Sequence, residues 1–359
     1  MERAPLTCGL SIKDPRSRRA GGSVLAPGRR GVAMPYGLRR CGRRRLGTML
    51  KFRIYGDFVK VYVSADLPRD LAERLSRAVE VVGRDRMGEA EAALCFRITP
   101  EELKSMPRLR FLQVITAGLD HLPWEAIPPH VVVAGNAGSN ADAVAEFAVA
   151  MALGAYKRVI HYDRRMKRGE YGRDVGIPMA VGSKAAVLGL GEIGTRVAKM
   201  LAALGLRVYG FSRTRKEGPW VFTSDLLEAM AGARIAVSAL PLNKHTRGLV
   251  KYQHLAAMDG EGVFVNVGRA EVVERGAVER ILRERPGFIF ASDVWWSRSD
   301  FAKDADIISL PNVVATPWVA GGYGNELVWR RMLEEAVDNL LRWVNGETPR
   351  NIARREDYV

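Results

Sequence analysis

Three closely spaced glycines, Gly189, Gly191 and Gly194, give the chain the pattern G-x-G-x-x-G. They follow a short apolar run, Ala185 to Leu188, that suits a buried parallel strand, and they precede apolar residues at helical spacing, such as Val197. In such a strand–turn–helix unit, the first glycine permits a tight turn. The second lets backbone approach a pyrophosphate, and the third lets helix and strand pack closely. The pattern therefore predicts a dinucleotide site.

The helix expected after these glycines would offer its first amides to the phosphates. Glu192 and Ile193 occupy its first positions, where N–H groups have no partner within the helix and the helix dipole is positive. We expect both amides to bind the pyrophosphate. The alternative is a glycine-rich turn without a ligand, and the flanking strand and helix favour the first interpretation.

The segment after the next expected strand, Arg207 to Phe211, indicates which dinucleotide is bound. An NAD site usually has an acidic residue here, about 20 residues past the glycines, that holds the ribose 2′-hydroxyl. This chain instead reads Ser212-Arg213-Thr214-Arg215, so no carboxylate repels a 2′-phosphate and two guanidinium groups can hold one. The segment predicts NADP, with NAD possible. The alternative is that both arginines are simply solvated.

Alternating strand-like and helix-like segments must position these residues. Apolar residues at helical spacing predict a long helix at 141–157, which Ser139 and Asp142 would cap. They also predict a last helix at 326–344. The charged stretch 161–176 is expected to be an irregular linker or surface arm. The apolar runs predict two parallel sheets, one with strands at 52–55, 59–63, 92–98, 109–115 and 131–134, and one with strands at 185–188, 207–211, 234–239, 262–267, 287–292 and 312–316.

The positive charge is concentrated at the N-terminus. Of the formal net charge of +15, residues 1–50 carry +10, from 12 Lys and Arg against 2 Asp and Glu, and the remaining residues carry +5 (15 minus 10). Residues 1–48 form a basic leader with three interpretations: a nucleic-acid-binding arm, an organelle transit peptide, or sequence upstream of a true start at Met49. The third is favoured, because arginine outnumbers lysine throughout the chain, as high-GC coding produces. We therefore do not expect nucleic acid as a partner.

Composition also excludes several classes of protein. No apolar run reaches the roughly 18 residues that a membrane-spanning helix needs. The three cysteines, Cys8, Cys41 and Cys95, form neither a disulfide framework nor a zinc pattern. We expect a cytoplasmic protein with no bound metal and no membrane partner.

Further motifs resemble the family of D-isomer-specific 2-hydroxyacid dehydrogenases. Asn266 to Ala270, followed by Val272-Val273-Glu274, is similar to the family motif N-x-x-R-G-x-x-V-D. The resemblance runs from about residue 50 to the end of the sequence. Other similar segments stand in the family's order: Ala117-Gly118-Leu119-Asp120, Asn136-Ala137-Gly138, Val144-Ala145-Glu146, Leu240-Pro241-Leu242, Thr246-Arg247-Gly248, Ala291-Ser292-Asp293-Val294 and Asn312 to Pro317.

The resemblance implies an α/β fold of two doubly wound parallel-sheet domains, a Rossmann cofactor domain inserted in a flavodoxin-like substrate domain. It places the substrate domain at residues 49–148 plus 319–359 and the NAD(P)-binding domain at residues 149–318. The active site would lie in the cleft between them. The family usually forms dimers through the cofactor domain, so we expect a homodimer.

The resemblance also assigns the site residues. Arg269 corresponds to the catalytic arginine, whose planar and permanently charged guanidinium suits holding a carboxylate and polarising a 2-oxo group. Ala117 and Gly118 correspond to the loop whose amides bind the other side of that carboxylate. Cofactor contacts are implied for Leu240, Pro241, Thr246, Val267 and Asp293.

The family's acid–base pair is absent. Trp318 stands where the family has a histidine after Thr-Pro, and Arg298 stands where it has the glutamate that orients this histidine. Neither replacement titrates near neutral pH, so neither moves a proton. His121 follows the substrate loop and is the histidine best placed to substitute. The proton donors left open are His121, His130, His161, His245, His254, Tyr323 and Asp300.

Three functions are consistent with these residues. The first is an oxidoreductase that transfers a hydride between NADP(H) and a small D-2-hydroxy or 2-oxo acid, such as glyoxylate or hydroxypyruvate. The second is a dinucleotide-binding protein that no longer catalyses and acts as a cofactor sensor or partner subunit. The third is an enzyme with a changed substrate, in which Arg298 and Trp318 bind a second acidic or planar group. The retained Arg269 and glycine pattern favour the first.

Overall fold

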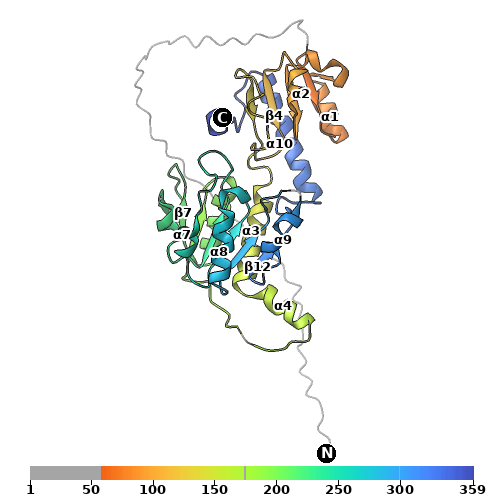
Figure 1. Ribbon diagram of the computed structural model, residues 1–359. Helices are drawn as coiled ribbons and strands as arrows, with labels where there is room; N and C mark the ends of the chain where they lie inside the picture. The colour runs from red at the N-terminus through yellow and green to blue at the C-terminus, as the bar shows by residue number, and fades with distance from the viewer. Residues whose placement is uncertain (1–57, 174, 299) are drawn as a thin grey trace, which may run out of the picture. The chain divides into compact units, whose positions relative to one another are not determined.

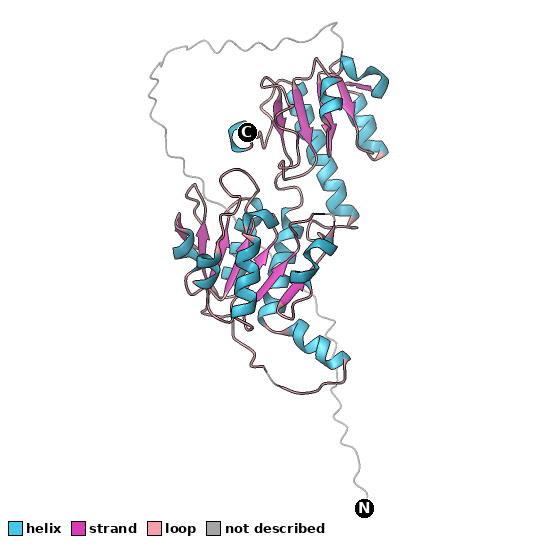
Figure 2. Cartoon of the chain, in the orientation of Figure 1, coloured by secondary structure: helices cyan, strands magenta, loops and turns pink. Residues whose placement is uncertain are grey.

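The computed structural model describes residues 58–173, 175–298 and 300–359, which form two parallel sheets flanked by helices (Figures 1 and 2). The basic leader and the expected strand at 52–55 lie outside the described residues. Every element described below belongs to one compact unit that runs to Val359.

The first sheet is parallel throughout and has the strand order β2-β1-β3-β4-β5. This is the 2-1-3-4-5 order of a flavodoxin-like sheet, as predicted. Its central strands β3 and β4 are fully buried, because parallel sheets are covered on both faces. The elements of this part are β1 (Lys60–Val63), α1 (Arg69–Ser76), β2 (Glu80–Val82), η1 (Arg84–Glu89), β3 (Ala92–Cys95), α2 (Pro100–Lys104), β4 (Phe111–Val114), β5 (Val132–Ala134), α10 (Glu326–Val344) and η4 (Arg355–Asp357).

The last long helix, α10, has the bounds that the sequence predicts and returns to the first sheet. Figure 1 shows α10 beside β4, and the two elements are in contact. Leu333, Val337 and Leu340 on one face of α10 are completely buried in the same apolar cluster as Phe111 of β4. Burying that apolar stripe is what holds this distant segment on the sheet.

The second sheet is also parallel and has the order β12-β11-β10-β9-β6-β7-β8. The strand order reverses between β6 and β9, which creates the switch point where doubly wound sheets bind ligands. The predicted fold class is confirmed. The elements are α3 (Ala141–Tyr156), α4 (Val159–Lys167), β6 (Lys184–Leu188), α5 (Glu192–Ala203), β7 (Arg207–Phe211), β8 (Val221–Thr223), α6 (Leu226–Met230), β9 (Ile235–Ser238), α7 (Tyr252–Ala256), β10 (Val263–Asn266), η2 (Ala270–Val272), α8 (Arg275–Glu284), β11 (Ile289–Ser292), η3 (Phe301–Asp304), α9 (Ala305–Ile308) and β12 (Val313–Ala315).

Two predictions about helices in this region are wrong. Helix α4 occupies part of the stretch 161–176 that the sequence predicts to be irregular, because its charged residues alternate with apolar residues in an amphipathic pattern. Ser139 does not cap α3. The N-cap residue is Asn140, the Ser139 hydroxyl donates to the Asn136 carbonyl, and Asp142 instead pairs with arginines of other helices.

Candidate functional site

The glycine loop between β6 and α5 has the geometry that a dinucleotide requires. Gly189 has a positive φ of 93°, which permits the tight turn at the end of β6. A Cβ on Gly194 would lie 1.7 Å from the backbone oxygen of Gly189, so only glycine allows the helix to approach the strand this closely. A Cβ on Gly191 would meet no atom within 4 Å, which leaves open space over the loop.

The first turn of α5 has the uncapped N-terminus that the predicted anion site requires. Gly191 is the N-cap residue, and no side chain caps the helix, so the amides of Glu192 and Ile193 belong to an uncapped helix N-terminus. The Glu192 carboxylate pairs with Arg196 at 2.8 Å. Open space over the loop and an uncapped helix N-terminus fit the pyrophosphate of a dinucleotide.

Two alanine substitutions in this loop are expected to have different effects. Gly194→Ala forces its Cβ onto a backbone oxygen, and we expect the free energy of unfolding to fall by about 1–3 kcal/mol, as overpacking usually causes. Gly191→Ala meets no protein atom, so stability should be kept within about 0.5 kcal/mol. Its methyl group should still weaken NADPH binding about tenfold or more, or about 1.4 kcal/mol. Urea unfolding and NADPH titration measure the two effects, and an equal loss of stability in both variants would contradict this account.

A cleft of about 1110 Å³ adjoins this helix N-terminus. Its lining comes from the segments after β3, β4, β10 and β11, from α3, α5 and α10, and from the glycine-rich loop before α10. The carboxyl ends of strands from both sheets therefore contribute to one cavity. The predicted site residues in its lining are Ala117, Gly118, Ile193, Val267, Arg269, Asp293, Arg298 and Trp318.

Arg269 lies directly against the predicted substrate loop. A Cβ on Gly118 would lie 2.1 Å from Nη2 of Arg269, so only glycine at this position leaves room for the guanidinium. Its Nε donates to Asp120 at 3.0 Å and its Nη1 donates to the Gly268 carbonyl at 2.9 Å. The guanidinium carbon is 5.3 Å from the centroid of the Trp318 ring, within cation–π range. These contacts hold Nη2 toward the substrate loop.

Arg298 is engaged by carboxylates of the chain itself. Its Nε donates to Glu271 and its Nη2 donates to Asp120, both at 2.9 Å. Asp120, whose side chain is 6% exposed, therefore bridges Arg298 and Arg269. The two arginines and two carboxylates form one network without net charge. The hypothesis that Arg298 binds a second acidic group of the substrate must therefore compete with these two carboxylates.

Trp318 stands at the position of the absent histidine in a left-handed backbone conformation, with φ of 61°. Its loop is fixed by Asp293, whose carboxylate accepts hydrogen bonds from the Thr316 hydroxyl at 2.5 Å and from the amides of Val319 and Ala320 at 3.0 and 2.8 Å. The Asp293 carbonyl also accepts from the Trp318 amide at 3.0 Å. Asp293, predicted to contact the cofactor, thus positions the Trp318 loop in this structure.

His121 and Tyr323 are the residues among the open proton donors that line the cleft, within the described part of the chain. Tyr323 is 86% exposed and lies in the glycine-rich loop before α10. The other candidates lie outside the cleft lining: His130, His161, His245, His254 and Asp300.

The surroundings of His121 suit a neutral imidazole. Its Nε2 lies 2.8 Å from the Phe96 carbonyl, which can only accept, so we assign the ring proton to Nε2. Burial lowers the pKa of His121, so the neutral form persists to lower pH than in an ordinary histidine. A neutral ring that donates its only N–H to a backbone carbonyl is a poor general acid.

We therefore expect His121→Asn to keep kcat within about threefold of the unaltered chain at pH 6–8, because losing a true general acid costs about 10²–10⁴ in rate. Steady-state NADPH oxidation over this pH range measures it. A drop of about 100-fold would instead identify His121 as the proton donor.

The residues predicted to hold a 2′-phosphate follow β7 and are engaged within the chain. Ser212 donates to the Thr214 carbonyl at 2.6 Å, and Arg215 pairs with a neighbouring exposed glutamate at 2.9 Å. Arg213 faces the carboxylate of Asp357 at 3.5 Å. Sequence reasoning missed Asp357, because it lies 144 positions from Arg213 and belongs to no motif.

The loop after β9 is closed by Thr246. Its hydroxyl donates to the Pro241 carbonyl at 2.6 Å and accepts from the Asn243 amide at 2.9 Å. A Cβ on Gly268 would lie 2.4 Å from the Leu240 carbonyl, so the loops after β9 and β10 are in close contact. Contacts of Leu240, Pro241 and Thr246 with a cofactor stay predictions.

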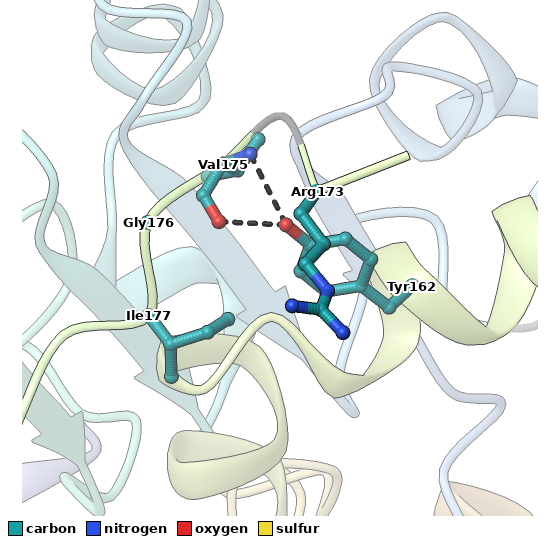
Figure 3. Close-up of a pocket in the computed structure, with 5 residues that line it drawn as sticks. All are labelled: Tyr162, Arg173, Val175, Gly176 and Ile177. Atoms are coloured by element: carbon teal, nitrogen blue, oxygen red, sulfur yellow. Dashed lines mark hydrogen bonds between the residues drawn. The ribbon is translucent and has the colours of Figure 1, made fainter. Parts of the chain in front are cut away.

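A smaller pocket of about 520 Å³ lies along the segment that follows α4 (Figure 3). The Tyr162 hydroxyl accepts from the Val175 amide at 3.1 Å and donates to the Val175 carbonyl at 2.6 Å, which ties this segment to α4. Arg173 and Ile177 complete its walls with Gly176. None of the predicted site residues lines it.

A doubly wound sheet with an open glycine loop at its switch point, and an arginine against the predicted substrate loop, are the features of a dinucleotide-dependent oxidoreductase. Residues 149–320 match the model of the D-isomer specific 2-hydroxyacid dehydrogenase NAD-binding domain. A glyoxylate reductase of Aeropyrum pernix is 30% identical over 279 residues, which cover 72% of this chain and 81% of that protein.

Two solved structures extend the comparison. A Pyrobaculum aerophilum protein described as a candidate formate dehydrogenase is 68% identical, with a TM-score of 0.81 and coverage of 84% of this chain and 100% of that one. A D-isomer specific 2-hydroxyacid dehydrogenase of Xanthobacter autotrophicus, solved with NADPH and MES, is 25% identical, with a TM-score of 0.71 and coverage of 84% and 99%.

The chain belongs to the D-isomer-specific 2-hydroxyacid dehydrogenase family. It contains an NAD(P)-binding domain and is an oxidoreductase that transfers a hydride between a nicotinamide dinucleotide and a 2-hydroxy or 2-oxo acid.

Proposed function

We propose that this chain reduces a small 2-oxo acid, such as glyoxylate or hydroxypyruvate, and that it uses NADPH. The observation that carries the proposal is the placement of the Arg269 Nη2 against Gly118 in a cleft that the uncapped N-terminus of α5 adjoins. That arrangement supplies one binding group for each charged part of the reactants. Relatives named glyoxylate reductases support the choice of substrate class.

The chain's own groups perform the binding and the polarisation. When bound, the nicotinamide supplies the hydride. Arg269 and the amides of Ala117 and Gly118 hold the substrate carboxylate, and the guanidinium stabilises the negative charge that develops on the 2-oxo oxygen. Trp318 lines the cleft, where its indole holds the guanidinium through the cation–π contact.

The proton that completes the reduction comes from water in the cleft. Asp120 is paired with both Arg269 and Arg298, and the Asp293 carboxylate accepts three hydrogen bonds from the loop of Trp318. Neither carboxylate is available to move a proton. We therefore expect turnover about 10²–10⁴-fold slower than a comparable site with a general acid.

The test is NADPH oxidation by the full chain with glyoxylate and hydroxypyruvate, together with calorimetric titration of NADPH and NADH. Binding and slow turnover support the proposal. Binding of NADPH without turnover of any 2-oxo acid would support the alternative, a cofactor sensor, which the named relatives do not favour. Binding of neither nucleotide would refute both.

A second candidate reaction is oxidation of formate. Formate loses a hydride from carbon to the nicotinamide and leaves as CO₂, so the reaction needs no proton donor or acceptor. The lack of a free titratable group beside Arg269 among the described residues favours it, and the similar Pyrobaculum aerophilum protein is described as a candidate formate dehydrogenase. Reduction of NADP⁺ or NAD⁺ by formate, measured in the same preparation, distinguishes the two reactions.

We propose a homodimer formed through the segment that contains α4. Helix α3 packs against α5 and β10 of its own chain, so it is not an exposed partner face. The segment from α4 to β6 instead exposes a series of apolar side chains. Monomeric proteins rarely expose large contiguous apolar patches. The exposed apolar side chains are Val159, Met166, Tyr171, Ile177, Met179 and Val181. Sedimentation of the full chain tests the proposal, and a monomer at micromolar concentration would refute it.

The remaining expectations also stay proposals. The proposed domain boundaries are residues 49–148 plus 319–359 and residues 149–318, supported by the packing of α10 on the first sheet. No helix in the described part of the chain is long and apolar enough to cross a membrane. We propose a cytoplasmic location. Cys95, a buried free thiol whose pKa burial raises to about 12, is compatible with it.

A further inference from the structure

The C-terminal tail places a carboxylate on the arginine predicted to recognise the 2′-phosphate. Asp357 lies in η4 and is only 8% exposed. Its two oxygens each lie 3.5 Å from a terminal nitrogen of Arg213, and Oδ1 lies 3.6 Å from Nε2 of His245. The parallel pairing of two nitrogens with two oxygens is the arrangement by which arginine binds carboxylates and phosphates.

Other contacts hold this tail in place independently of the Asp357 side chain. The amide of Lys244 donates to the Asp357 carbonyl at 3.1 Å, and its ammonium donates to the Val359 carbonyl at 3.0 Å. Tyr358 stacks on Trp124, with ring centroids 4.5 Å apart and planes at 5°. The tail therefore has anchors that remain when the Asp357 carboxylate is changed.

This carboxylate faces the segment after β7 that the sequence predicts to bind the adenosine half of the cofactor. Arg213 follows β7 and His245 follows β9, the two strands that flank β6 and its glycine loop. The adenine ribose of a dinucleotide lies near the end of the strand after the glycine motif. Asp357 therefore lies beside a residue expected to distinguish a 2′-phosphate from a 2′-hydroxyl.

The contact is also weak enough to be exchanged. Arg213 is 60% exposed at its side chain, and 3.5 Å is longer than the usual 2.7–2.9 Å of a charge-assisted hydrogen bond. A phosphate monoester carries about 1.5 to 2 negative charges at pH 7, against one for Asp357, so it competes well for Arg213. A ribose 2′-hydroxyl carries no charge and donates instead to a carboxylate.

We propose that Asp357 is a specificity-determining residue that sets the preference between NADPH and NADH. It competes with the 2′-phosphate of NADPH for Arg213 and supplies, from the C-terminal segment, a carboxylate acceptor for the 2′-hydroxyl of NADH, which Ser212 does not provide. The preference for NADPH is consequently smaller than the two arginines after β7 alone would give. This inference rests on the proposed function, because it concerns the cofactor of the same site.

The test compares the dissociation constants of NADPH and NADH for the full chain and for Asp357→Asn, at fixed salt. We expect Asp357→Asn to bind NADPH about five- to tenfold tighter and NADH no tighter, so that the preference for NADPH rises about tenfold. Glu356→Gln is the matched control. It removes the same charge one position away, and Glu356 is 63% exposed and paired with Arg354 instead. The preference of Glu356→Gln for NADPH over NADH should stay within about twofold of that of the unaltered chain.

A second pair of variants separates recognition from a purely structural role. With Arg213 replaced by Gln, the additional change Asp357→Asn should no longer tighten NADPH binding, because the competing contact is already gone. A preference that changes less than twofold in Asp357→Asn, in a protein that binds NADPH, would overturn the inference. Failure of the unaltered chain to bind either dinucleotide would refute the proposed function instead.

Discussion

Replacing Arg269 by methionine is expected to lower kcat/KM for a 2-oxo acid by about 10³-fold and to leave the dissociation constant of NADPH within about threefold. In the proposed mechanism Arg269 holds the carboxylate and stabilises charge on the 2-oxo oxygen, so its loss removes both ground-state and transition-state interactions. Methionine matches the length of the side chain but has no donors. Steady-state kinetics and calorimetry on the same protein give the two quantities.

Arg269→Lys is the matched variant for this experiment. Lysine keeps the charge but lacks the fork that donates at once to Asp120 and toward Gly118. We expect kcat/KM of Arg269→Lys to exceed that of Arg269→Met by at most about tenfold. If Arg269→Met retained more than a tenth of the activity, the guanidinium would not be the polarising group and the proposed mechanism would be wrong.

Restoring the family's acid–base pair is expected to have the opposite effect, an increase in kcat of about 10²–10⁴-fold. Trp318→His is compatible with the backbone, because histidine tolerates the left-handed conformation found at this position better than most residues. Arg298→Glu is harder to accommodate. It replaces a cation that bridges Asp120 and Glu271 by a third carboxylate.

We therefore expect activity to rise only when the new glutamate is relieved of this repulsion, in Trp318→His with Arg298→Glu and Glu271→Gln. Arg298→Glu alone should destabilise the protein by about 2 kcal/mol, less than the full cost of breaking a buried pair because Arg298 is partly exposed. Urea unfolding of each variant and a pH–rate profile of the triple variant are the measurements. A triple variant that folds but gains less than tenfold would show that the missing pair does not limit turnover.

The sequence by itself determined the dinucleotide site, because that site is built from one continuous strand–turn–helix unit. The special geometry of Gly189 and the tight packing at Gly194 are properties of neighbouring residues along the chain. The apolar spacing of α10 likewise gave its bounds, because the stripe that it buries repeats at the helical period. The family motifs predicted Arg269 and the substrate loop in the same way, and the structure places Arg269 against Gly118 of that loop.

Local patterns were less informative where a side chain had several partners within reach. Asp142 matches a capping pattern with Ser139, yet it pairs with Arg196 and Arg331 from two other helices. A charged arginine on another helix can outcompete a local cap of similar strength. The sequence contains the cap signal but not the competing partner.

Only the tertiary structure decided what Arg298, Asp120 and Asp357 do. Arg298 lies 178 positions from Asp120, and Arg213 lies 144 positions from Asp357. Asp120 and Arg298 meet because they follow strands of different sheets whose carboxyl ends line one cleft. Arg213 and Asp357 meet because the C-terminal segment returns to the end of β7. The sign and spacing of charges along a chain do not encode such meetings, since the packing of whole sheets and helices determines which charges become neighbours.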